Sequence, residues 1–538
     1  MKRYTMRMIA LLLALVMGLT LLSGCSGKNN GNENDQQNTP SDTQQTTATT
    51  QQDDKQTDGE KTDPAKPARD SLTFVTWIKH TTYDVTAGGT ADKGINHAIF
   101  DTLLKFGPDG TYEPMLAESW EEADGGMSVI LHLRDDVTFH DGSTFDADDV
   151  IYFFDKGMEG KFATRITPYV ASYEKLDQYT VKLTKPNIYT SVLAFLVEHA
   201  YIIPKEAHSA DPEGFNQHPI GTGPYTFVSE EADGSIILKA YDNYYGEAPG
   251  VANIRVQPPL DASAAVIALE TGDADFIVNV PNSQHSIIAG NDKLTLVTSP
   301  NWSSQMVLLM GKKLNADINL RKAIFYGINR ENALILAAEG QGSVTKELFS
   351  DRMMGEFKGK VPMEGYDLEK AKAALAESDY DGEPIYITIT GNAALAQSIQ
   401  SDLKQVGIDV KIEQVDTAAL LQKLNTGEMD MYQTDMGNST MTPQSLLNTF
   451  SEMGKQIGEN MFTTPEYNAL VSEIKAMSDN SQLEAKTQEG LEMLRDMYTF
   501  VNLYQADANF AYSSDFVYDY PVSATTFIYY YAQIKPAA

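Results

Sequence analysis

Cys25 is the only cysteine among the 538 residues of the chain, and two small residues, Ser23 and Gly24, separate it from an apolar run. Basic residues precede that run at the start of the chain, as they do in an N-terminal secretory signal. A thiol is a nucleophile that accepts covalent groups, and a single cysteine has no partner for an intramolecular disulfide. The position of Cys25 therefore predicts a covalent modification at the end of an export signal.

Residues 22–25 resemble the lipobox of bacterial lipoproteins. In that family the cysteine thiol is diacylated, the peptide bond before it is cut, and the new amino terminus is acylated. The resemblance implies a signal peptide over 1–24 and a lipid anchor at Cys25, because several acyl chains together hold a protein stably on a membrane. The apolar run is short for the alternative, a membrane-spanning helix. We expect an extracytoplasmic chain, lipid-anchored to the cell membrane.

Residues 25–70, which begin with the lipidated cysteine, are rich in Asn, Gln, Thr and Asp and show no apolar periodicity. This composition predicts a disordered tether with a reach of about 35–40 Å. The whole chain has 41 Lys and Arg against 74 Asp and Glu, a net charge of -33. Such a charge argues against nucleic acid as a partner.

The other reactive side chains do not have the spacings of an enzyme site. Residues 472–475 and 478–480 resemble two penicillin-binding motifs, but only two residues separate them and a single helix is expected to carry both. The chain has no Gly-rich nucleotide-binding run and no histidine pair at helical spacing. We therefore expect no catalytic site, no cofactor and no metal site. His140 is expected to be a hydrogen-bonding residue in a turn.

Several blocks of residues together carry a resemblance to one family. They span residues 116–120, 131–142, 147–150, 218–225, 241–245, 268–275 and 321–330. In this order they resemble the bacterial extracellular solute-binding proteins of the oligopeptide, dipeptide and nickel class, known as family 5. Asn329 stands where that family usually has an aspartate. Spaced blocks in the same order are more specific than any single motif.

The resemblance implies an α/β fold of the two-lobed, periplasmic-binding-protein-like type II class, with an extra subdomain inserted in lobe one. The implied boundaries are 71–110, 223–310 and 505–538 for lobe one, 111–222 for the inserted subdomain, and 311–504 for lobe two. Hinge strands join the lobes, which close on a solute. Gly221 and Gly223 are expected at a tight chain crossing with positive φ.

The local sequence predicts the elements that position a site. Residues 72–78 indicate a buried strand, and Asp146 with Asp149 indicates a helix cap. Farther along, strands are expected at 385–390, 408–412 and 429–434, and helices at 395–406 and 417–424, ending near Gly407 and Gly427. This alternation predicts a parallel sheet covered by helices. Ligands bind such sheets at the carboxyl ends of the strands.

After the strand expected at 429–434, the chain departs from the family. Peptide-binding members typically carry Trp-x-x-Asp-Tyr-x-Asp-Pro there, whose first aspartate binds the peptide ammonium and whose tryptophan walls the pocket. Of the matching residues 436–443, only Pro443 is retained, and Ser439 replaces the aspartate. A serine does not supply the negative charge that a buried ammonium needs. Asp435 carries a carboxylate, but four residues from the matching position.

The groups expected near the cleft are aromatic or neutral, apart from Asp435. The predicted ligand-binding residues are Tyr83, Asn301, Trp302, Tyr432, Asp435, Met436, Asn438 and Ser439. Trp77 is expected in the core on its strand, whereas the polar neighbours of Trp302 argue against full burial. Stacking aromatics and amides suit either sugar rings or uncharged peptide segments.

The resemblance implies a monomeric binding protein that captures a small solute between two lobes and delivers it to the permease subunits of an ABC importer. A peptide is the first expectation, because it is the commonest ligand of this family. An oligosaccharide stays open as the alternative, favoured by Ser439 and by the aromatic and amide side chains. A nickel chelate and a ligand-presenting sensor role are further alternatives.

Overall fold

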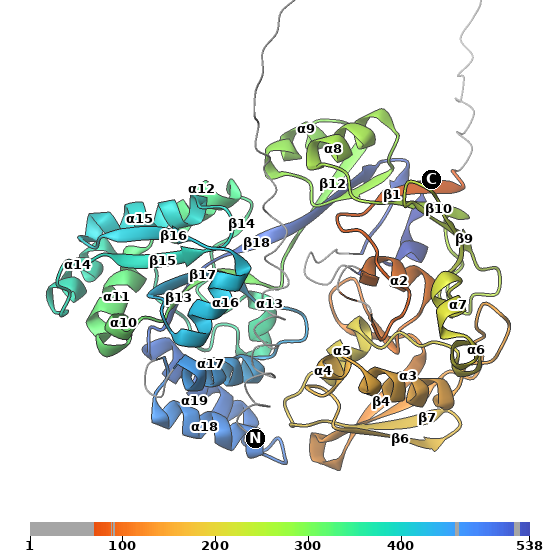
Figure 1. The fold of residues 1–538 in the computed structure, drawn as a ribbon, viewed down its shortest axis with the longest axis horizontal. Helices are drawn as coiled ribbons and strands as arrows, with labels where there is room; N and C mark the ends of the chain where they lie inside the picture. Colours follow the sequence, from red (N-terminus) through yellow and green to blue (C-terminus); the bar gives the residue numbers. More distant parts are fainter. Residues whose placement is uncertain (1–68, 88, 90–91, 458–461, 521–527, 538) are drawn as a thin grey trace, which may run out of the picture.

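The structure is a computed structural model that describes residues 69–87, 89, 92–457, 462–520 and 528–537. The predicted signal peptide, Cys25 and most of the predicted tether lie outside these residues. Two α/β lobes lie side by side and are joined by the long strand β18 (Phe500–Ser513), which runs from one into the other (Figure 1). The predicted α/β class with two lobes is confirmed.

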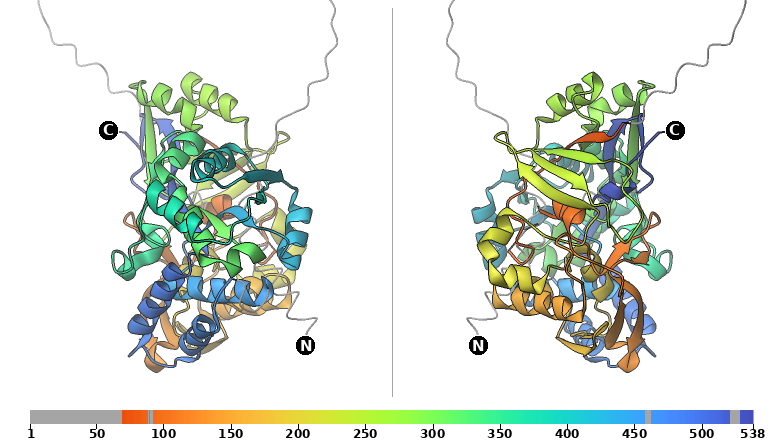
Figure 2. Two further views of the ribbon diagram at one scale, coloured as in Figure 1. Left: turned by 90° about the vertical axis from the view of Figure 1, so that its left-hand side faces the viewer. Right: turned by 90° about the vertical axis from the view of Figure 1, so that its right-hand side faces the viewer.

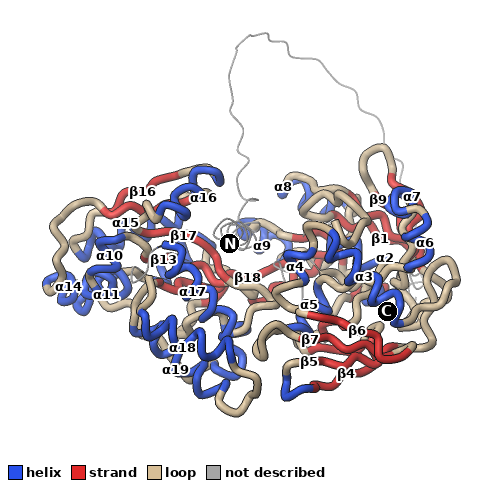
Figure 3. Tube along the Cα trace, turned by 60° about the horizontal axis from the view of Figure 1, so that its bottom comes forward, coloured by secondary structure: helices blue, strands red, loops and turns tan. Residues whose placement is uncertain are grey.

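One mixed sheet runs through both lobes. Its other strands are β1 (Ser71–Val75), β8 (Tyr225–Glu230), β9 (Ile236–Ala240), β10 (Asn253–Gln257), β11 (Phe276–Val278), β12 (Leu294–Pro300), β13 (Ser304–Leu309), β14 (Gly342–Ser343), β15 (Ile385–Ile389), β16 (Val410–Gln414) and β17 (Met431–Met436). Their order is β16-β15-β17-β13-β18-β11-β1-β10-β9-β8, with β12 and β14 also paired to β18. The strands of both lobes therefore meet at β18 (Figure 3).

Lobe two contains the predicted parallel unit. Strand β15 pairs in parallel with β16 and with β17. Its helices are α10 (Lys312–Ala316), α11 (Ile318–Gly327), α12 (Arg330–Ala338), α13 (Asp351–Met354), α14 (Leu368–Ala376), α15 (Ala394–Val406), α16 (Thr417–Thr426), α17 (Pro443–Ile457), α18 (Pro465–Ala476) and α19 (Leu483–Asp496). Gly407 ends α15 at φ 109°, a left-handed conformation that glycine adopts without strain.

Two strands of lobe two are shifted from their predicted bounds: β16 lies at Val410–Gln414 rather than 408–412, and β17 at Met431–Met436 rather than 429–434. Strand β17 begins and ends two residues later than expected, because its partner β13 pairs Ser304 with Met436 and Gln305 with Asp435. Asp435 therefore lies inside the strand. Gly437 follows at φ 129° and ends it.

The part of lobe one around β1 has a core on each face of the sheet. Phe74 packs with the residues around α2 (Lys93–Ile99), and Val75 packs beneath α8 (Ala262–Thr271) and α9 (His285–Ala289). Strand β1 is shorter than predicted, because the Thr76 hydroxyl donates to the Ile78 carbonyl and turns the chain. Trp77 consequently lies beyond the strand. The chain end adds β19 (Phe516–Val517) and β20 (Lys535–Pro536).

A separate four-stranded sheet, in the order β4-β5-β7-β6, lies within the predicted insert. The elements of this region are β3 (Tyr112–Pro114), β4 (Ala117–Ala123), β5 (Ser128–Leu133), β6 (Ser172–Asp177), β7 (Thr180–Thr184), α3 (Ala147–Glu159), α4 (Ala163–Ile166), α5 (Val192–Glu198), α6 (Lys205–Ala210) and α7 (Pro212–Gln217). Strand β2 (Leu104–Phe106), in the predicted lobe-one segment, pairs with β3. In the side views of Figure 2 this region lies at the same end of the molecule as α17–α19, opposite α8 and α9. The domain boundaries stay predictions; the one at 504/505 falls inside β18.

The chain crossing at Gly221 and Gly223 has a different cause from the one predicted. Neither glycine has a positive φ. A Cβ on Gly221 would lie 1.9 Å from the Ile99 carbonyl oxygen, and one on Gly223 would lie 2.6 Å from the Ile99 carbonyl carbon. Glycine is therefore required because two backbone segments touch. His140 fastens the crossing, since its Nε2 and the Gly223 carbonyl are 2.9 Å apart.

Candidate functional site

Trp302 lies in the connector 301–303 between β12 and β13, and it touches a residue from each lobe. Its ring centroid lies 6.3 Å from that of Phe106, in β2. On the other side, the guanidinium carbon of Arg352, in α13, lies 5.4 Å from the Trp302 centroid. We call these three residues the hinge stack. It joins the lobes at the point where the chain crosses between them.

The backbone of Trp302 is fixed by hydrogen bonds. The Ser350 hydroxyl donates to the Trp302 carbonyl at 2.5 Å, and the Trp302 amide donates to the Asn301 side chain at 2.7 Å. The carbonyl of Asn301 accepts from the Gln505 side chain in β18. Asn301 therefore positions its neighbour, while the Trp302 ring stays partly exposed.

The loop after β17 packs against the same place. A Cβ on Gly437 would lie 2.8 Å from the Trp302 carbonyl oxygen, so a glycine brings the loop into contact with the connector. The Asn438 side chain accepts from the Thr440 amide and hydroxyl at 3.0 and 2.7 Å. The Thr440 hydroxyl in turn lies 2.8 Å from the hydroxyl of Tyr169, in the predicted insert. This contact also spans the two lobes.

We define the interlobe site as the hinge stack together with Asn438, Ser439, Thr440 and Tyr169. Ser439 is 4% exposed, and its hydroxyl has no hydrogen-bond partner among the described residues. An unpaired buried hydroxyl costs free energy until a partner binds it. The structure thus brings together Trp302, Asn438 and Ser439 of the predicted ligand-binding residues, with Asn301 behind them.

Asp435 lies two residues before this loop, opposite Gln305 in the sheet. Its side chain is half-buried, and it forms no ion pair with any described residue. Burial raises the pKa of its carboxyl group to about 6. The group is therefore a carboxylate at neutral pH that has lost hydration without gaining a cation.

Tyr432 and Met436 belong to the core of lobe two, with 3% and 2% of their surfaces exposed. They sit an odd number of positions from Asp435 along β17, so their side chains point to the opposite face of the sheet. These contacts bring neither residue to the exposed part of the interlobe site. That they bind the solute stays a prediction.

Tyr83 lies in lobe one, in the loop between β1 and α2, away from the other predicted residues. Its ring packs 4.3 Å from that of His80 and 5.2 Å from that of Phe227, in β8. Burial raises the pKa of its hydroxyl group well above the usual range. The described contacts make Tyr83 a core residue of lobe one, and its predicted contact with the solute gains no support from them.

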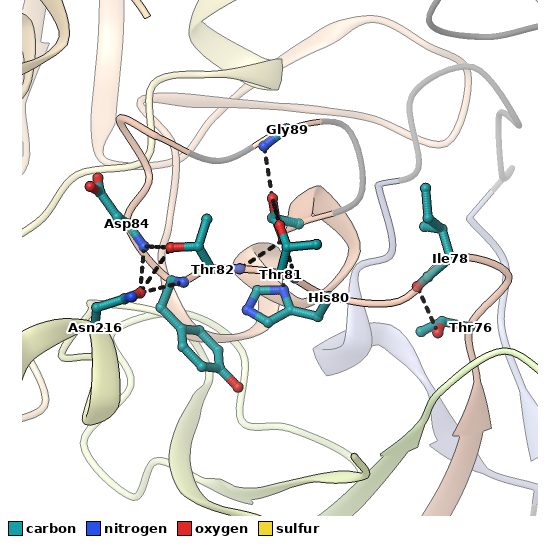
Figure 4. Close-up of polar contacts among 10 residues, drawn as sticks. Thr76, Ile78, His80, Thr81, Thr82, Asp84, Gly89 and Asn216 are labelled. Carbon is teal, nitrogen blue, oxygen red and sulfur yellow. Dashed lines mark hydrogen bonds and ion pairs between the residues drawn. The ribbon is translucent and has the colours of Figure 1, made fainter. Parts of the chain in front are cut away.

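Hydrogen bonds to two side chains hold the loop that contains Tyr83 (Figure 4). The Asn216 side chain accepts from the Tyr83 and Asp84 amides at 2.8 and 3.0 Å. The carboxylate of Asp92 accepts from the amides of Thr81 and Gly89 at 2.6 and 2.7 Å. The loop is thereby fixed on the body of lobe one.

Trp77 lines a separate cavity of about 430 Å³ at the carboxyl ends of β1 and β11. Leu260, Ala262 and Asn279 lie on other sides of this cavity. Trp77 is half-buried, whereas its predicted place on a strand implied burial in the core. The position agrees with the rule that ligand-sized spaces form at the carboxyl ends of strands.

Sequence reasoning missed Phe106, Tyr169, Arg352 and Thr440. They come from β2, the segment after α4, α13 and the loop after β17, and nothing local relates these elements. Among the residues that the structure describes, no group of three or more His, Cys, Asp or Glu lies close enough to hold a metal ion. In the same part of the chain, no helix is both long and apolar enough to cross a membrane.

The sequence matches known proteins over most of its length. Residues 111–457 match the model of the bacterial extracellular solute-binding proteins, family 5. The oligopeptide-binding protein AppA of Bacillus subtilis is 26% identical over 458 residues, 78% of this chain and 83% of AppA. The dipeptide-binding protein of Escherichia coli is 28% identical, over 64% of this chain and 71% of its own length. The nickel-binding periplasmic protein of Escherichia coli is 24% identical, over 74% and 82%.

Solved structures share the fold. HbpA2 from Haemophilus parasuis superposes with a TM-score of 0.75 at 21% identity, covering 87% of this chain and 100% of that one. The substrate-binding protein CtaP from Listeria monocytogenes gives the same TM-score at 19% identity, with the same coverage. The relatives are binding proteins and not enzymes. The chain belongs to family 5 of the bacterial extracellular solute-binding proteins, the substrate-binding components of ABC transporters.

Proposed function

We propose that the chain is a lipid-anchored binding protein that captures a peptide between its lobes and delivers it to the permease subunits of an ABC importer. The observation that carries the proposal is the interlobe site, in which Phe106 and Tyr169 meet Trp302 and Thr440 across the lobe boundary. A solute held there contacts both lobes. Such contacts favour the closed arrangement over the open one, which is how binding shifts a two-state equilibrium.

Asp435 replaces the missing family aspartate in this proposal. A peptide ammonium needs a carboxylate in a poorly hydrated place, and Ser439 offers only a hydroxyl. Asp435 is half-buried and unpaired among the described residues, and its pKa of about 6 reflects that lack of a cation. An ammonium bound beside it offsets the cost of burying its charge. Trp302, Asn438 and Ser439 then contact the uncharged part of the peptide.

An oligosaccharide is the second candidate, and Ser439 favours it. The unpaired hydroxyl of Ser439 suits a sugar hydroxyl, which both donates and accepts. A sugar ring also stacks on an aromatic face such as that of Trp302. A sugar, however, leaves the charge of Asp435 unpaired. For this reason we propose the peptide first.

Binding rather than catalysis is proposed because the serine of the candidate catalytic motif is not set up for attack. Ser472, in the penicillin-binding-like motif, donates its hydroxyl hydrogen to the Asn468 carbonyl of its own helix at 2.7 Å. A serine nucleophile needs a general base at that hydrogen instead. Lys475 follows on the same helix α18. Residues 472–475 are therefore part of a helix surface. Residues 478–480 lie beyond the end of α18, so the prediction that a single helix carries both motifs is wrong.

Native mass spectrometry of protein lacking residues 1–25, purified without refolding, tests the solute class. Bound masses that sequence as peptides support the proposal. Masses spaced by a hexose unit contradict it and favour the oligosaccharide. If the protein is purified empty, thermal shifts with a peptide library and an oligosaccharide library decide between the two.

The lipid anchor is tested separately with the full chain. Replacing Cys25 by serine removes the acyl acceptor, so the Cys25→Ser protein should appear in the medium or soluble extracytoplasmic fraction while the unmodified sequence stays with membranes. Metabolic labelling with a fatty acid checks the same step. Membrane retention of unlabelled Cys25→Ser protein would contradict the proposed anchor.

A further inference from the structure

Arg352 is a cation of the interlobe site that the family blocks do not include. It lies in the short helix α13, half-buried, with its guanidinium carbon 5.4 Å from the centre of the Trp302 ring. No hydrogen bond or ion pair joins its guanidinium to any described residue. A guanidinium has five N–H donors, and stacking on a ring satisfies none of them.

The acidic residue beside it is already engaged. The Asp351 carboxylate lies 2.7 Å from the Lys358 ammonium and accepts from the Thr345 hydroxyl at 3.0 Å. Burial lowers the pKa of the Arg352 guanidinium, and no neighbouring acid raises it back. The chain has almost twice as many acidic as basic residues, yet no carboxylate among the described residues pairs with this arginine.

Most of the other arginines that the structure describes have polar partners. Four form ion pairs with carboxylates: Arg69, Arg134, Arg255 and Arg495. Arg321 and Arg330 each donate to a backbone carbonyl, but the two terminal nitrogens of Arg330 have no partner among the described residues. Burial lowers the pKa of the Arg165 guanidinium, and the charge of Asp92 offsets part of that effect. An arginine left half-buried without an anion costs free energy, because its lost hydration is not replaced. An anion that arrives with a ligand removes that cost.

The surroundings hold Arg352 ready for such an anion. The Ser350 hydroxyl donates to the Trp302 carbonyl and also accepts from the Met353 amide, so hydrogen bonds join α13 to the connector. The guanidinium lies over the Trp302 ring, and its N–H edge has no acceptor among the described residues. That edge matches the two oxygens of a carboxylate.

We propose that Arg352 binds a carboxylate of the solute. The inference rests on the proposed function and narrows it: the captured solute carries an acidic group, such as the free carboxyl terminus of a peptide. Asp435 and Arg352, both in lobe two, then offer opposite charges to the two ends of a zwitterion. The Trp302 ring packs against the guanidinium and supports it. A neutral sugar uses neither charge.

The test compares two libraries of short peptides that differ only at the carboxyl terminus, one as free acids and one as amides. Unmodified protein should retain the acids with an affinity about tenfold higher or more, the range of a charge-assisted hydrogen-bonded pair. Arg352→Gln should lose that preference and bind acids and amides alike. Arg352→Lys keeps the positive charge but lacks the planar group of paired N–H donors, so it should retain part of the preference for acids.

Arg134→Gln is the matched control. Arg134 also lies over an aromatic ring, 5.0 Å from the centroid of Tyr245, but it pairs with Asp136. Its loss should leave the acid preference unchanged. The melting temperature of unliganded Arg352→Gln adds an independent readout: it should stay the same or rise, since an uncompensated charge is removed, whereas a structural arginine would lower it.

Two outcomes separate the inference from the proposed function. If peptides bind but Arg352→Gln keeps the full preference for acids, or if unmodified protein shows none, Arg352 does not bind the carboxylate and the peptide proposal stands. If neither library binds and an oligosaccharide does, the proposed function fails and the inference fails with it.

Discussion

At the scale of single residues, the interlobe site depends on polar groups that lack a hydrogen-bond partner or a counter-ion among the described residues. The Ser439 hydroxyl has no partner among the described residues, and the Asp435 carboxylate and the Arg352 guanidinium have no counter-ion there. Groups in this state are costly in a folded protein and are usually satisfied. The presence of all three groups in lobe two, near one connector, is the strongest local indication that something binds there.

Replacing Trp302 by alanine should weaken solute binding by about 1 kcal/mol or more, because the ring contacts both lobes and supports Arg352. Isothermal titration calorimetry with the solute recovered from purified protein measures the change. Trp120→Ala is the control: Trp120 lies in β4, in the sheet of the predicted insert, and its loss should not change affinity. Unchanged affinity in folded Trp302→Ala would remove Trp302 from the solute-binding residues.

Asp435 makes binding depend on pH. Its pKa of about 6 lies above the usual value for aspartate, so without solute the group becomes protonated below about pH 6. An ammonium favours the charged form, so binding releases a proton below pH 6. Affinity should therefore fall roughly tenfold per pH unit as the pH drops from 6 toward 4. Titrations in buffers of different ionisation enthalpy measure this proton release.

Asp435→Asn should remove that pH dependence and weaken the binding of peptides with a free amino terminus. Stability should change in the opposite direction. A raised carboxyl pKa stabilises the fold fully only below the unfolded value, and this contribution is lost as the pH rises through 6. At pH 7 the asparagine variant without solute should thus be more stable, by about 1–2 kcal/mol after discounting for solvent. Asp409→Asn, an exposed residue paired with Lys411, should show neither effect.

At the scale of elements, one hydrogen bond joins the segment after α4 to the loop after β17. The hydroxyls of Tyr169 and Thr440 lie 2.8 Å apart across the lobe boundary. Tyr169→Phe should weaken solute binding by about 0.5–1.5 kcal/mol, because the bond is present only when the lobes meet. Tyr173→Phe is matched, since its hydroxyl donates to Asp155 inside the insert. A double-mutant cycle with Thr440→Val that shows no coupling would contradict the role of this bond in closure.

The crossing of 221–223 over the end of α2 should tolerate no side chain. A Cβ at 223 would lie 2.6 and 2.7 Å from backbone atoms of Ile99 and Ala98, and backbone does not move aside as a flexible side chain does. Gly223→Ala should therefore cost about 2 kcal/mol of stability or more in chemical denaturation. Gly160→Ala, where a Cβ meets no atom within 4 Å, should be close to neutral. Equal stability of the two variants would contradict the described crossing.

At the scale of the whole molecule, the lobes touch on both sides of the hinge. The Asn282 side chain, after β11, donates to the Ala338 carbonyl at the end of α12 at 2.9 Å, while Tyr169 meets Thr440 below. A solute that adds contacts between the lobes should stabilise this arrangement. A free solute concentration of about a hundred times the dissociation constant should raise the free energy of unfolding by about 2.7 kcal/mol.

Removing residues 1–68 should change neither the melting temperature nor the solute-induced rise in it. Among the described residues, the three hydrophobic clusters begin at Leu72 and end at Ile534. The polar composition of residues 25–70 predicts that they form no packed core. Differential scanning calorimetry of the full and shortened chains, with and without solute, checks this. A lower melting temperature of the shortened protein would mean that the N-terminal segment packs on the lobes.

Much of the architecture follows from the sequence by itself, because its causes are local. The alternation of apolar residues around Gly407 and Gly427 predicts the parallel unit of lobe two, which β15, β16 and β17 form. Asp146 and Asp149 predict a cap, and both side chains accept from the backbone at the start of α3. These features depend only on residues within one segment, through its hydrophobic periodicity and its capping residues.

Only the tertiary structure decided which side chains form the site. Phe106, Trp302 and Arg352 come from three distant segments, and no spacing in the chain relates them. The same holds for the register of β17: pairing of Met436 with Ser304 placed Asp435 inside the strand and Tyr432 and Met436 in the core. Local periodicity tells which face of an element is buried. The contacts made at a hinge depend on how two separately folded lobes pack against each other, and that information is spread over the whole chain.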